Sequence, residues 1–378
     1  MMPARSAVPA ILLAAAIAPS ATAQTLSQRG FVEGRGIFFP QETPNDSTRA
    51  VGDLRVRDEV FVKPADWVQF AGGLDIRANS HDQVDDRWHV DVSDRGTRRP
   101  RLSVRRLAAT LTHGRNTIDV GKQFIRWGKA DIVNPTDRFA PRDFVNVVDN
   151  EFLAVTAARV TAQAGGETFE LVWVPRFTPS RVPLFDQRWS AWPPELGHVR
   201  LVDHGAALPR GSQIGGRWSH IGARLEYSLS FFNGFNHLPN IDAQSLPSEI
   251  DVMRVYPAIR TYGADTAVPT RWFTLKGETA YFTSRSTSTD EYAIFVVQLE
   301  RQTGEWVLVG GYAGEVVTVR RSRLRLIAGS RGRSSAARLT RSIPIAVLHS
   351  KVPSGRLAVA RTRKRNTPGR MGSIGARP

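Results

Sequence analysis

Most of the chain alternates between apolar and polar residues with a period of two, which predicts β-strands that have one apolar and one polar face. In the segment 53–63, Leu54, Val56 and Val60 share one face, and only Asp58 interrupts it. The segment 223–231 is the most regular, with apolar residues at alternate positions from Leu225 to Phe231. Further strands are predicted at 30–39, 67–79, 106–112, 117–125, 153–163, 168–174, 213–220, 253–262, 272–282, 292–301 and 305–318.

The polar faces of these strands carry full charges, and no amphipathic helix interrupts the series. The side chains predicted to share the charged face are Arg55, Arg57, Glu59, Asp75, Arg77, Arg224, Glu226, Lys276 and Glu278. Aromatic residues gather near strand ends, where the girdles of membrane barrels lie. These residues are Phe38, Phe39, Trp67, Trp127, Trp173, Trp218, Trp272 and Trp306. We therefore predict an all-β fold, an antiparallel transmembrane β-barrel of about 12 strands whose charged face lines a water-filled lumen.

The first residues predict export from the cytoplasm. Arg5 precedes an apolar run, 8–18, that is too short to span a bilayer as a helix, and Ala21-Thr22-Ala23 fits a small-x-small cleavage site. Residues 1–23 are therefore predicted to be a secretory signal peptide, and residues 24–319 the barrel. The chain contains no cysteine, which suits the bacterial envelope.

The segment 119–143, DVGKQFIRWGKADIVNPTDRFAPRD, begins as a strand and then leaves regular structure at an Asn-Pro step. We predict that it is a fixed loop that faces water and constricts the pore, where opposed basic and acidic side chains filter solutes by charge. The constriction residues would be Arg126, Lys129, Asp131, Asp137, Arg138, Arg142 and Asp143. The alternative is an extracellular loop that is held by its own salt bridges and keeps Trp127 at the membrane interface.

This segment and the upstream stretch GFVEGRGIFF at 30–39 resemble a group of bacterial porin-like outer-membrane barrels, uncharacterised relatives of the alginate-export type. In that group a Gly-x-Gln strand runs into a Trp-Gly turn and an Asn-Pro loop. The matching positions here are Gly121, Gln123, Trp127, Gly128, Asn134 and Pro135. The resemblance covers residues 30 to about 318 and implies a barrel and a transport role, but no substrate.

The charge balance changes after Val319. Sixteen of the 51 Lys and Arg residues lie in 320–378, which contains none of the 35 Asp and Glu residues, so the net charge of +16 belongs to this tail. Its alternation is confined to fragments at 343–348 and 357–360, and we predict that the tail is disordered. Barrels of the resembling group end in an aromatic strand, whereas this chain ends in Gly-Ala-Arg-Pro. The tail is therefore predicted to be an out-of-frame remnant of an incomplete barrel.

No motif for covalent chemistry stands out. The glycines lack the spacing of a nucleotide-binding loop, there is no Gly-x-Ser-x-Gly elbow, and the histidines form no His-x-x-x-His pair. We expect no enzymatic activity, no cofactor and no metal site. Adjacent loop carboxylates could serve a glycosidase or bind Ca²⁺. Solvated charge, or calcium-bridged contact with lipopolysaccharide, is the favoured interpretation of Asp85-Asp86, Asp149 with Glu151, and Asp290-Glu291.

Together these features predict an outer-membrane channel for passive or substrate-selective passage of small polar or anionic solutes. Its partners would be outer-membrane lipid, lipopolysaccharide and the barrel assembly machinery, and no nucleic acid. The main alternative is a secreted or periplasmic β-sandwich that binds polysaccharide through its Trp and Arg loops, because a soluble sandwich also alternates apolar and polar residues.

Overall fold

The structure is a computed structural model that describes residues 25–43, 45–131, 133–146, 148–190, 200–245, 249–287, 289–304 and 306–321, together with two strands at 338–350 and 359–362. The predicted signal peptide lies outside these residues. All regular structure in the described residues is β-strand. They contain no helix that is long and apolar enough to cross a membrane.

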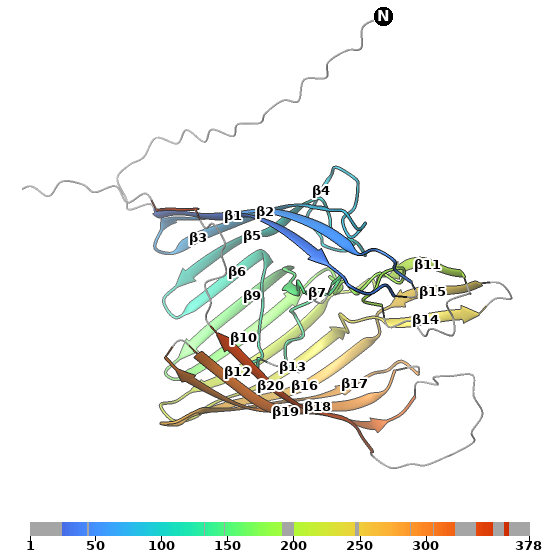
Figure 1. Cartoon of the computed structure of the whole chain (residues 1–378). Coiled ribbons are helices and arrows are strands. Elements are labelled where there is room, and N and C mark those ends of the chain that lie inside the picture. Colours follow the sequence, from blue (N-terminus) through green and yellow to red (C-terminus); the bar gives the residue numbers. More distant parts are fainter. Residues whose placement is uncertain are drawn as a thin grey trace, which may run out of the picture.

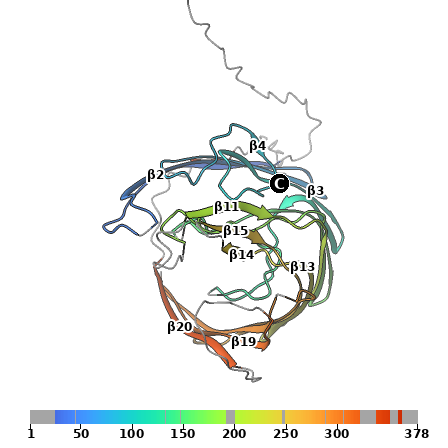
Figure 2. The same cartoon turned by 90° about the vertical axis from the view of Figure 1, so that its right-hand side faces the viewer.

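The strands form one large antiparallel sheet that curls into a ring (Figures 1 and 2). From β1 the order of its long strands is β1 (Thr25–Phe38), β2 (Ala50–Ala65), β3 (Val68–Asn79), β5 (Leu102–His113), β6 (Asn116–Gln123), β9 (Val155–Ala164), β10 (Glu167–Val174), β12 (Gln213–Ile221), β13 (Glu226–Phe235), β16 (Ala258–Pro269), β17 (Thr274–Thr283), β18 (Glu291–Thr303), β19 (Trp306–Val319) and β20 (Arg338–Ser350). On its other side β1 pairs with the short β21 (Val359–Thr362). The hydrogen-bonded order ends at β20 and β21, so the described strands form an open barrel.

Each predicted strand between 30 and 318 corresponds to a strand of this sheet, with two corrections. The predicted strand 253–262 is wrong, because it joins the end of β15 (Glu249–Val255) to the start of β16 across Pro257. Proline cannot donate a ladder hydrogen bond, and the two strands belong to different sheets. The strand predicted at 223–231 begins only at Glu226, so Arg224 lies in the preceding turn and is exposed rather than on the wall.

Smaller strands lie in the connections between the long strands of the ring. β11 (Arg200–Ala207), β14 (Asn240–Ser245) and β15 form a separate three-stranded sheet, and the two-residue strands β7 (Arg142–Asp143) and β8 (Glu151–Phe152) pair with each other. Another two-residue strand, β4 (Val90–Asp91), pairs parallel to β5. Within the predicted tail, β20 and β21 overlap the two fragments in which alternation was noted, and the rest of 322–378 lies outside the described residues.

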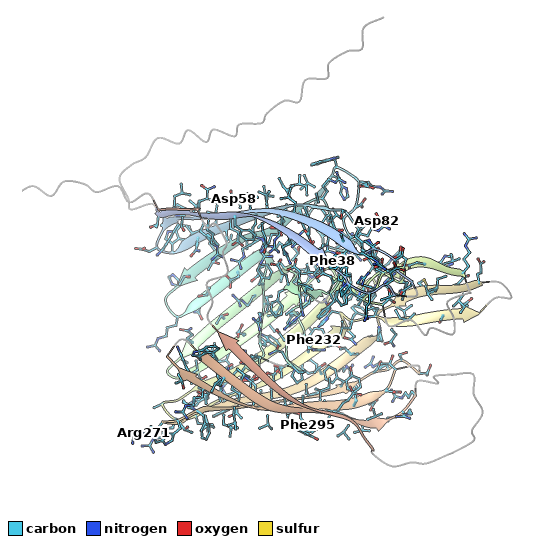
Figure 3. All side chains as sticks on the ribbon, viewed as in Figure 1. Phe38, Asp58, Asp82, Phe232, Arg271 and Phe295 are labelled. Atoms are coloured by element: carbon cyan, nitrogen blue, oxygen red, sulfur yellow. The ribbon has the colours of Figure 1, made fainter. Side chains whose placement is uncertain are left out.

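The two faces of the ring differ in the opposite sense to those of a soluble protein. On β2 and β3, Leu54 and Leu74 are 47% and 48% exposed, whereas the intervening Arg55 and Asp75 are 1% and 4% exposed. The buried face looks toward chain segments that fold inside the ring, and we call it the inner face. Figure 3 shows the side chains on both faces. The wall therefore turns its charges inward and its large apolar side chains outward.

Asp58 is the exception that the sequence pattern indicated. It lies on the outer face of β2, where its carboxylate accepts hydrogen bonds from the Gln28 amide at 3.0 Å. Neighbouring outward residues of β1 and β2 include Val32 and Leu54, which are exposed.

An arginine placed on the outer face tests whether this face meets lipid. In a bilayer, Leu74→Arg is expected to lower the free energy of unfolding by about 2–4 kcal/mol, because a charge in mid-strand must leave water for hydrocarbon. The control is Leu225→Arg, since Leu225 is similarly exposed but lies in a turn between strands. Equal tolerance of both substitutions, measured by urea unfolding in lipid vesicles, would contradict a lipid-facing wall.

Candidate functional site: a segment folded inside the ring

Residues 124–154 leave the wall after β6 and return to it at β9, and we call them the inward segment. β6 and β9 are hydrogen-bonded neighbours, with Gln123 paired to Val155, so the segment starts and ends at one place in the sheet. Its exit depends on Gly121, whose φ is +115° and where a Cβ atom would lie 2.3 Å from the carbonyl oxygen of Leu107. The Gln123 amide then donates to the backbone carbonyls of Asp119 and Ala157 at 3.2 and 3.1 Å.

Apolar side chains attach the inward segment to one side of the wall. Ile125, Trp127 and Phe139 are almost fully buried against inner-face residues of β9, β10, β13, β16 and β17. Phe139 packs edge-to-face on Trp127 and on Phe232, with both centroid separations at 5.1 Å. Full burial of one such side chain contributes on the order of 1.5–3 kcal/mol. The wall is shaped for these rings, because a Cβ at Gly215 would lie 2.7 Å from Phe139.

This packing corrects two expectations. The segment 119–143 was predicted to face water, yet its apolar residues form part of the buried core. Trp127 was predicted to lie at a strand end in an interfacial girdle, yet only 2% of its surface is exposed and it lies inside the ring. Because most residues of the segment are charged or polar, the sequence did not indicate that Ile125, Trp127 and Phe139 determine where it packs.

A single carboxylate on β17 fixes the turn of the inward segment. Glu278 accepts hydrogen bonds from the backbone N–H groups of Lys129, Ala130 and Thr136 at 2.9–3.0 Å, and from the Thr136 hydroxyl at 2.8 Å. Bonds from N–H groups to an ionised carboxylate are roughly twice as strong as neutral ones. Gly128 lets the backbone approach, since a Cβ there would lie 2.9 Å from the Glu278 carboxylate.

The Asn-Pro step closes the same turn. The Asn134 side chain donates a hydrogen bond to the carbonyl oxygen of Ala130, and the buried Pro135 follows it. The residues that carried the family resemblance therefore share one local task, which is to shape the exit and the turn of the inward segment.

Charged residues of the segment pair with charged residues of the wall. The Lys129 ammonium lies 2.7 Å from Glu226 on β13, and Asp131 lies 2.8 Å from Lys276 on β17. Asp131 also accepts a hydrogen bond from the Gln298 amide at 2.6 Å. Burial alone would raise the pKa of Asp131, but Lys276 and Gln298 hold that pKa below its usual value. Two predicted constriction residues are thus held by two predicted wall residues.

On the opposite side, the segment supplies carboxylates to an arginine-rich wall. Glu151 lies 2.7 Å from Arg55 and from Arg57 on β2, and 3.1 Å from Arg77 on β3. Asp149 adds contacts to Arg35 on β1 at 2.9 Å and to Arg77 at 3.4 Å. These two carboxylates were expected to be solvated or bridged to lipopolysaccharide, and that expectation is wrong for them, because both lie inside the ring.

The remaining wall charges also lie on the inner face. Arg57 donates two hydrogen bonds to Asp75, both at 2.6 Å, in a bidentate pair, and Glu59 lies 2.7 Å from Arg29. Thus, of the predicted wall residues, Arg224 alone lies off the inner face.

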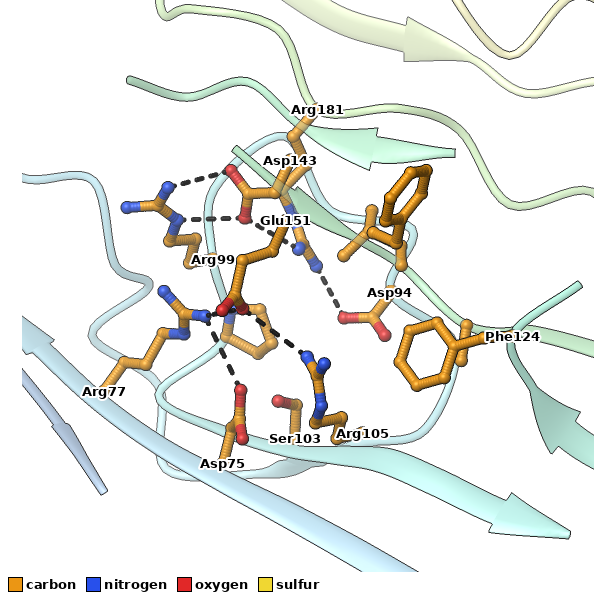
Figure 4. A pocket seen from close by; sticks show the side chains of 14 residues that line it. Asp75, Arg77, Asp94, Arg99, Ser103, Arg105, Phe124, Asp143, Glu151 and Arg181 are labelled. Atoms are coloured by element: carbon orange, nitrogen blue, oxygen red, sulfur yellow. Dashed lines mark hydrogen bonds and ion pairs between the residues drawn. The ribbon is translucent and has the colours of Figure 1, made fainter. Parts of the chain in front are cut away.

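Asp143 joins three separate loops beneath this wall (Figure 4). Its carboxylate accepts two hydrogen bonds from Arg99, at 2.9 and 3.0 Å, and one from Arg181 at 3.2 Å. Arg181 also forms an ion pair with Asp94 at 2.8 Å, and Asp94 forms a second ion pair with the Lys122 ammonium at 2.5 Å. Burial alone would raise the pKa of Asp143, but Arg99 and Arg181 lower that pKa to about 2.

The other four predicted constriction residues form one group. Asp137 accepts a hydrogen bond from the backbone N–H of Trp127 at 3.0 Å and one from the Arg126 guanidinium at 3.4 Å. Burial is the main reason that the pKa of Asp137 is raised. Arg126 and Arg142 both lie over the ring of Phe152, and Arg138 lies over Phe282. The seven predicted residues thus lie at three places in the inward segment. Lys129 and Asp131 lie at the turn, Asp143 lies between the loops, and the other four form the group described here.

The sequence did not single out several residues on which the site depends, namely Asp94, Arg99, Phe152 and Gln298. Arg181 stands in a proline-rich stretch whose composition is typical of a rigid surface loop, but it is 3% exposed and links the inward segment to the loop before β5. Their partners lie far away in the sequence, so no local pattern marks them. In the described part of the chain, no group of His, Asp and Glu side chains could hold a metal ion.

No protein-family model matches the chain, and no curated protein matches it. Similar solved structures include OmpT, an outer membrane protein of Vibrio cholerae, with 8% identity, a TM-score of 0.45 and coverage of 79% of this chain and 77% of that one. OmpF of Salmonella typhi has 9% identity, a TM-score of 0.41 and 82% coverage of both chains. OpdQ of Pseudomonas aeruginosa has 11% identity, a TM-score of 0.41 and coverage of 77% of this chain. The chain spans 65% of the length of OpdQ.

Removal of the Asp143 carboxylate is expected to loosen three loops together. Asp143→Asn leaves Arg99 and Arg181 buried without their shared counter-charge, a change that typically costs about 3–5 kcal/mol. Limited proteolysis and hydrogen exchange of the folded chain should show faster opening of the loops around residues 94, 143 and 181. Asp66→Asn is the control, because Asp66 is fully exposed in its pair with Lys63. Unchanged protection in Asp143→Asn would contradict this role.

The same carboxylate predicts an acid limit for loop protection. Because the pKa of Asp143 is lowered from 3.8 to about 2, its ionised form stabilises the fold fully above about pH 4, and this stabilisation is lost as the pH falls toward 2. Loop protection measured by hydrogen exchange should therefore hold from neutral pH to about pH 4 and decline below it. Asp143→Asn should remove this part of the pH dependence, and an identical decline in the variant would count against it.

Proposed function

We propose that the chain is a β-barrel of the bacterial outer membrane that forms a channel for small polar or anionic solutes. The observation that carries the proposal is the inverted wall, in which charged residues such as Arg55 and Glu278 are buried inside while alternate apolar residues are exposed outside. A protein in water gains free energy by the reverse arrangement. Only a surrounding hydrocarbon phase makes an outward apolar face favourable over so many strands.

The pattern of backbone pairing supports the same environment. Hydrocarbon cannot satisfy a free N–H or C=O group, so a strand that crosses a membrane must pair with a neighbour on each side. In the described sheet every long strand from β1 to β19 has a hydrogen-bonded neighbour on each side. Exposed tryptophans near strand ends, including Trp67, Trp272 and Trp306, fit an interfacial girdle.

The inward segment would act as the constriction of the channel. It carries side chains of both signs, and the Arg126 and Asp131 side chains are 47% and 57% exposed. Opposite charges fixed around a narrow passage filter ions and solutes through their field. The segment is suited to this task because apolar packing holds it on one side and ion pairs hold it on the other. Contact with lipopolysaccharide and recognition by the barrel assembly machinery belong to the same proposal.

The alternative of a soluble polysaccharide-binding sandwich has less support. A sandwich packs two sheets through apolar inner faces, whereas the sheet described here buries charged residues on the inner face of β2 and β3 and leaves alternate apolar residues exposed outside. An enzyme that uses loop carboxylates is also less supported, because Glu151 lies within ion-pair distance of four guanidinium groups, those of Arg55, Arg57, Arg77 and Arg105. A carboxylate held ionised by so many cations is poorly suited to act as a general acid.

Glu278→Ala in the full chain, reconstituted in planar bilayers, tests the constriction. The substitution removes the acceptor that holds Lys129, Ala130 and Thr136, so the turn should leave the wall and single-channel conductance should rise. Glu170→Ala is the control, because Glu170 on β10 has only a 3.8 Å contact with Arg159.

Two results would contradict the proposal. The first is the absence of conductance in a wild-type chain that shows heat-modifiable migration and is therefore folded. The second is recovery of the native protein in the soluble periplasmic fraction rather than in outer membranes.

A further inference from the structure

Three arginines of the inward segment, Arg126, Arg138 and Arg142, lack the close counter-charges that several other inner arginines have. Arg57, Arg99 and Arg181 each have a carboxylate within 2.6–2.9 Å. By contrast, within the described part of the chain Arg126 has one ion pair, its 3.4 Å contact with Asp137. Among the described residues, Arg138 and Arg142 have no salt bridge, and each reaches Asn134 instead, at 3.4 Å and 3.2 Å.

The three arginines are linked through shared neighbours, Phe152 and Asn134. The central carbons of Arg126 and Arg142 are 4.1 and 4.0 Å from the centroid of the Phe152 ring. Arg138 and Arg142 bind the backbone and the side chain of the same residue, Asn134. The Arg138 Nε group is buried and has no hydrogen-bond partner. Only one carboxylate, Asp137, forms an ion pair with any of these three arginines in the described chain, and it also accepts a hydrogen bond from the backbone N–H of Trp127.

The positive charge of these arginines lowers the pKa of neighbouring basic groups. Burial is the main reason that the pKa of Arg142 is lowered, and the neighbouring Arg126 lowers it further. The buried His237 imidazole, which is hydrogen-bonded to the Ser180 hydroxyl at 2.9 Å, has its pKa lowered to about 3 by burial and then by Arg138 and Arg142. His237 is therefore neutral at physiological pH and adds no charge to the cluster.

We propose that Arg126, Arg138 and Arg142 form a binding site for a small oxyanion, a carboxylate or phosphate group carried by a solute inside the ring. This site deepens the proposed function, because it names the anionic group that a solute would present to the constriction. Guanidinium groups suit this ligand, since their forked N–H donors match two oxygens of a carboxylate or phosphate. Arg126 is half-exposed and Arg142 is partly exposed, so an anion can reach these two from the interior, while the more deeply buried Arg138 adds positive charge behind them.

The aromatic rings explain how the cluster persists without a ligand. Guanidinium groups stacked on Phe152 and Phe282 gain cation–π attraction, which offsets part of their mutual repulsion. Phe152 holds Arg126 and Arg142 in place while leaving their N–H edges available. A bound anion would supply the counter-charge that the described chain does not.

The test uses the detergent-solubilised full chain and chloride as the probe. Exchange of chloride at an arginine site broadens its NMR resonance, and inorganic phosphate and acetate are then added separately as competitors. We expect Arg126→Gln and Arg142→Gln each to reduce the protein-induced broadening severalfold, and the double variant to abolish it. Stronger competition by phosphate or by acetate identifies which oxyanion the site prefers. Heat-modifiable migration checks that each variant is folded, and the exposed Arg126 gives at least one variant without a folding penalty.

Two controls separate recognition from general charge. Arg29→Gln removes an inner-face arginine that is 64% exposed and paired with Glu59, and it should leave the broadening unchanged. Arg126→Lys with Arg142→Lys keeps both charges but loses the fork, so chloride binding should largely persist while competition by acetate and phosphate weakens. Wild-type broadening in the variants to glutamine, or an equal loss in Arg29→Gln, would overturn the proposal.

Ion selectivity provides the link to transport. In bilayers with a potassium chloride gradient, the wild-type chain should prefer chloride, and the double variant to glutamine should lose this preference. Chloride binding without any conductance would refute the channel and leave the anion site standing. Conductance without arginine-dependent chloride binding would refute the site and leave the channel standing.

Discussion

Charge neutralisation inside the ring is the constraint on which the rest of the structure depends. Strands β2 and β3 turn Arg55, Arg57 and Arg77 inward, where little water reaches them. Moving a charge from water into such a place costs several kcal/mol unless a partner is supplied. The wall supplies part of this counter-charge through Glu33 and Asp75, and the inward segment adds Asp149 and Glu151. These ion pairs couple the segment to the wall.

The inward segment is attached by two different forces. Toward β9–β17 it buries aromatic and aliphatic side chains, and the area removed from water provides the attraction. Toward β1–β3 it forms ion pairs that are directional and depend on ionisation. The carboxylate of Glu278 adds a third attachment through the backbone. This combination fixes the segment in position while the side chains of Arg126 and Asp131 remain accessible.

The sequence predicted the wall well because each strand carries its own evidence. The period of two identifies a strand and its charged face without knowledge of its neighbours, and even the exception at Asp58 was placed on the outer face. Failures came where a feature depends on distant partners. Trp127 stands among charges in the sequence, but its environment comes from Phe139 and from the wall at Gly215 on β12. Arg181 is a surface residue by local composition, but Asp94 and Asp143 bury it. The boundary between β15 and β16 was missed because apolar alternation continues through Pro257.

The most direct test of the account asks which face of the wall meets lipid. The chain has no cysteine, so single cysteines can be labelled without ambiguity. Fluorescent labels at Leu74→Cys on the outer face and Gln69→Cys on the inner face of β3 would be exposed in turn to quenchers in lipid tails and in water. The account predicts that the Leu74→Cys label is quenched from the lipid and the Gln69→Cys label from the water. A Leu74→Cys label that lipid-borne quenchers cannot reach, or that aqueous quenchers can, would contradict it.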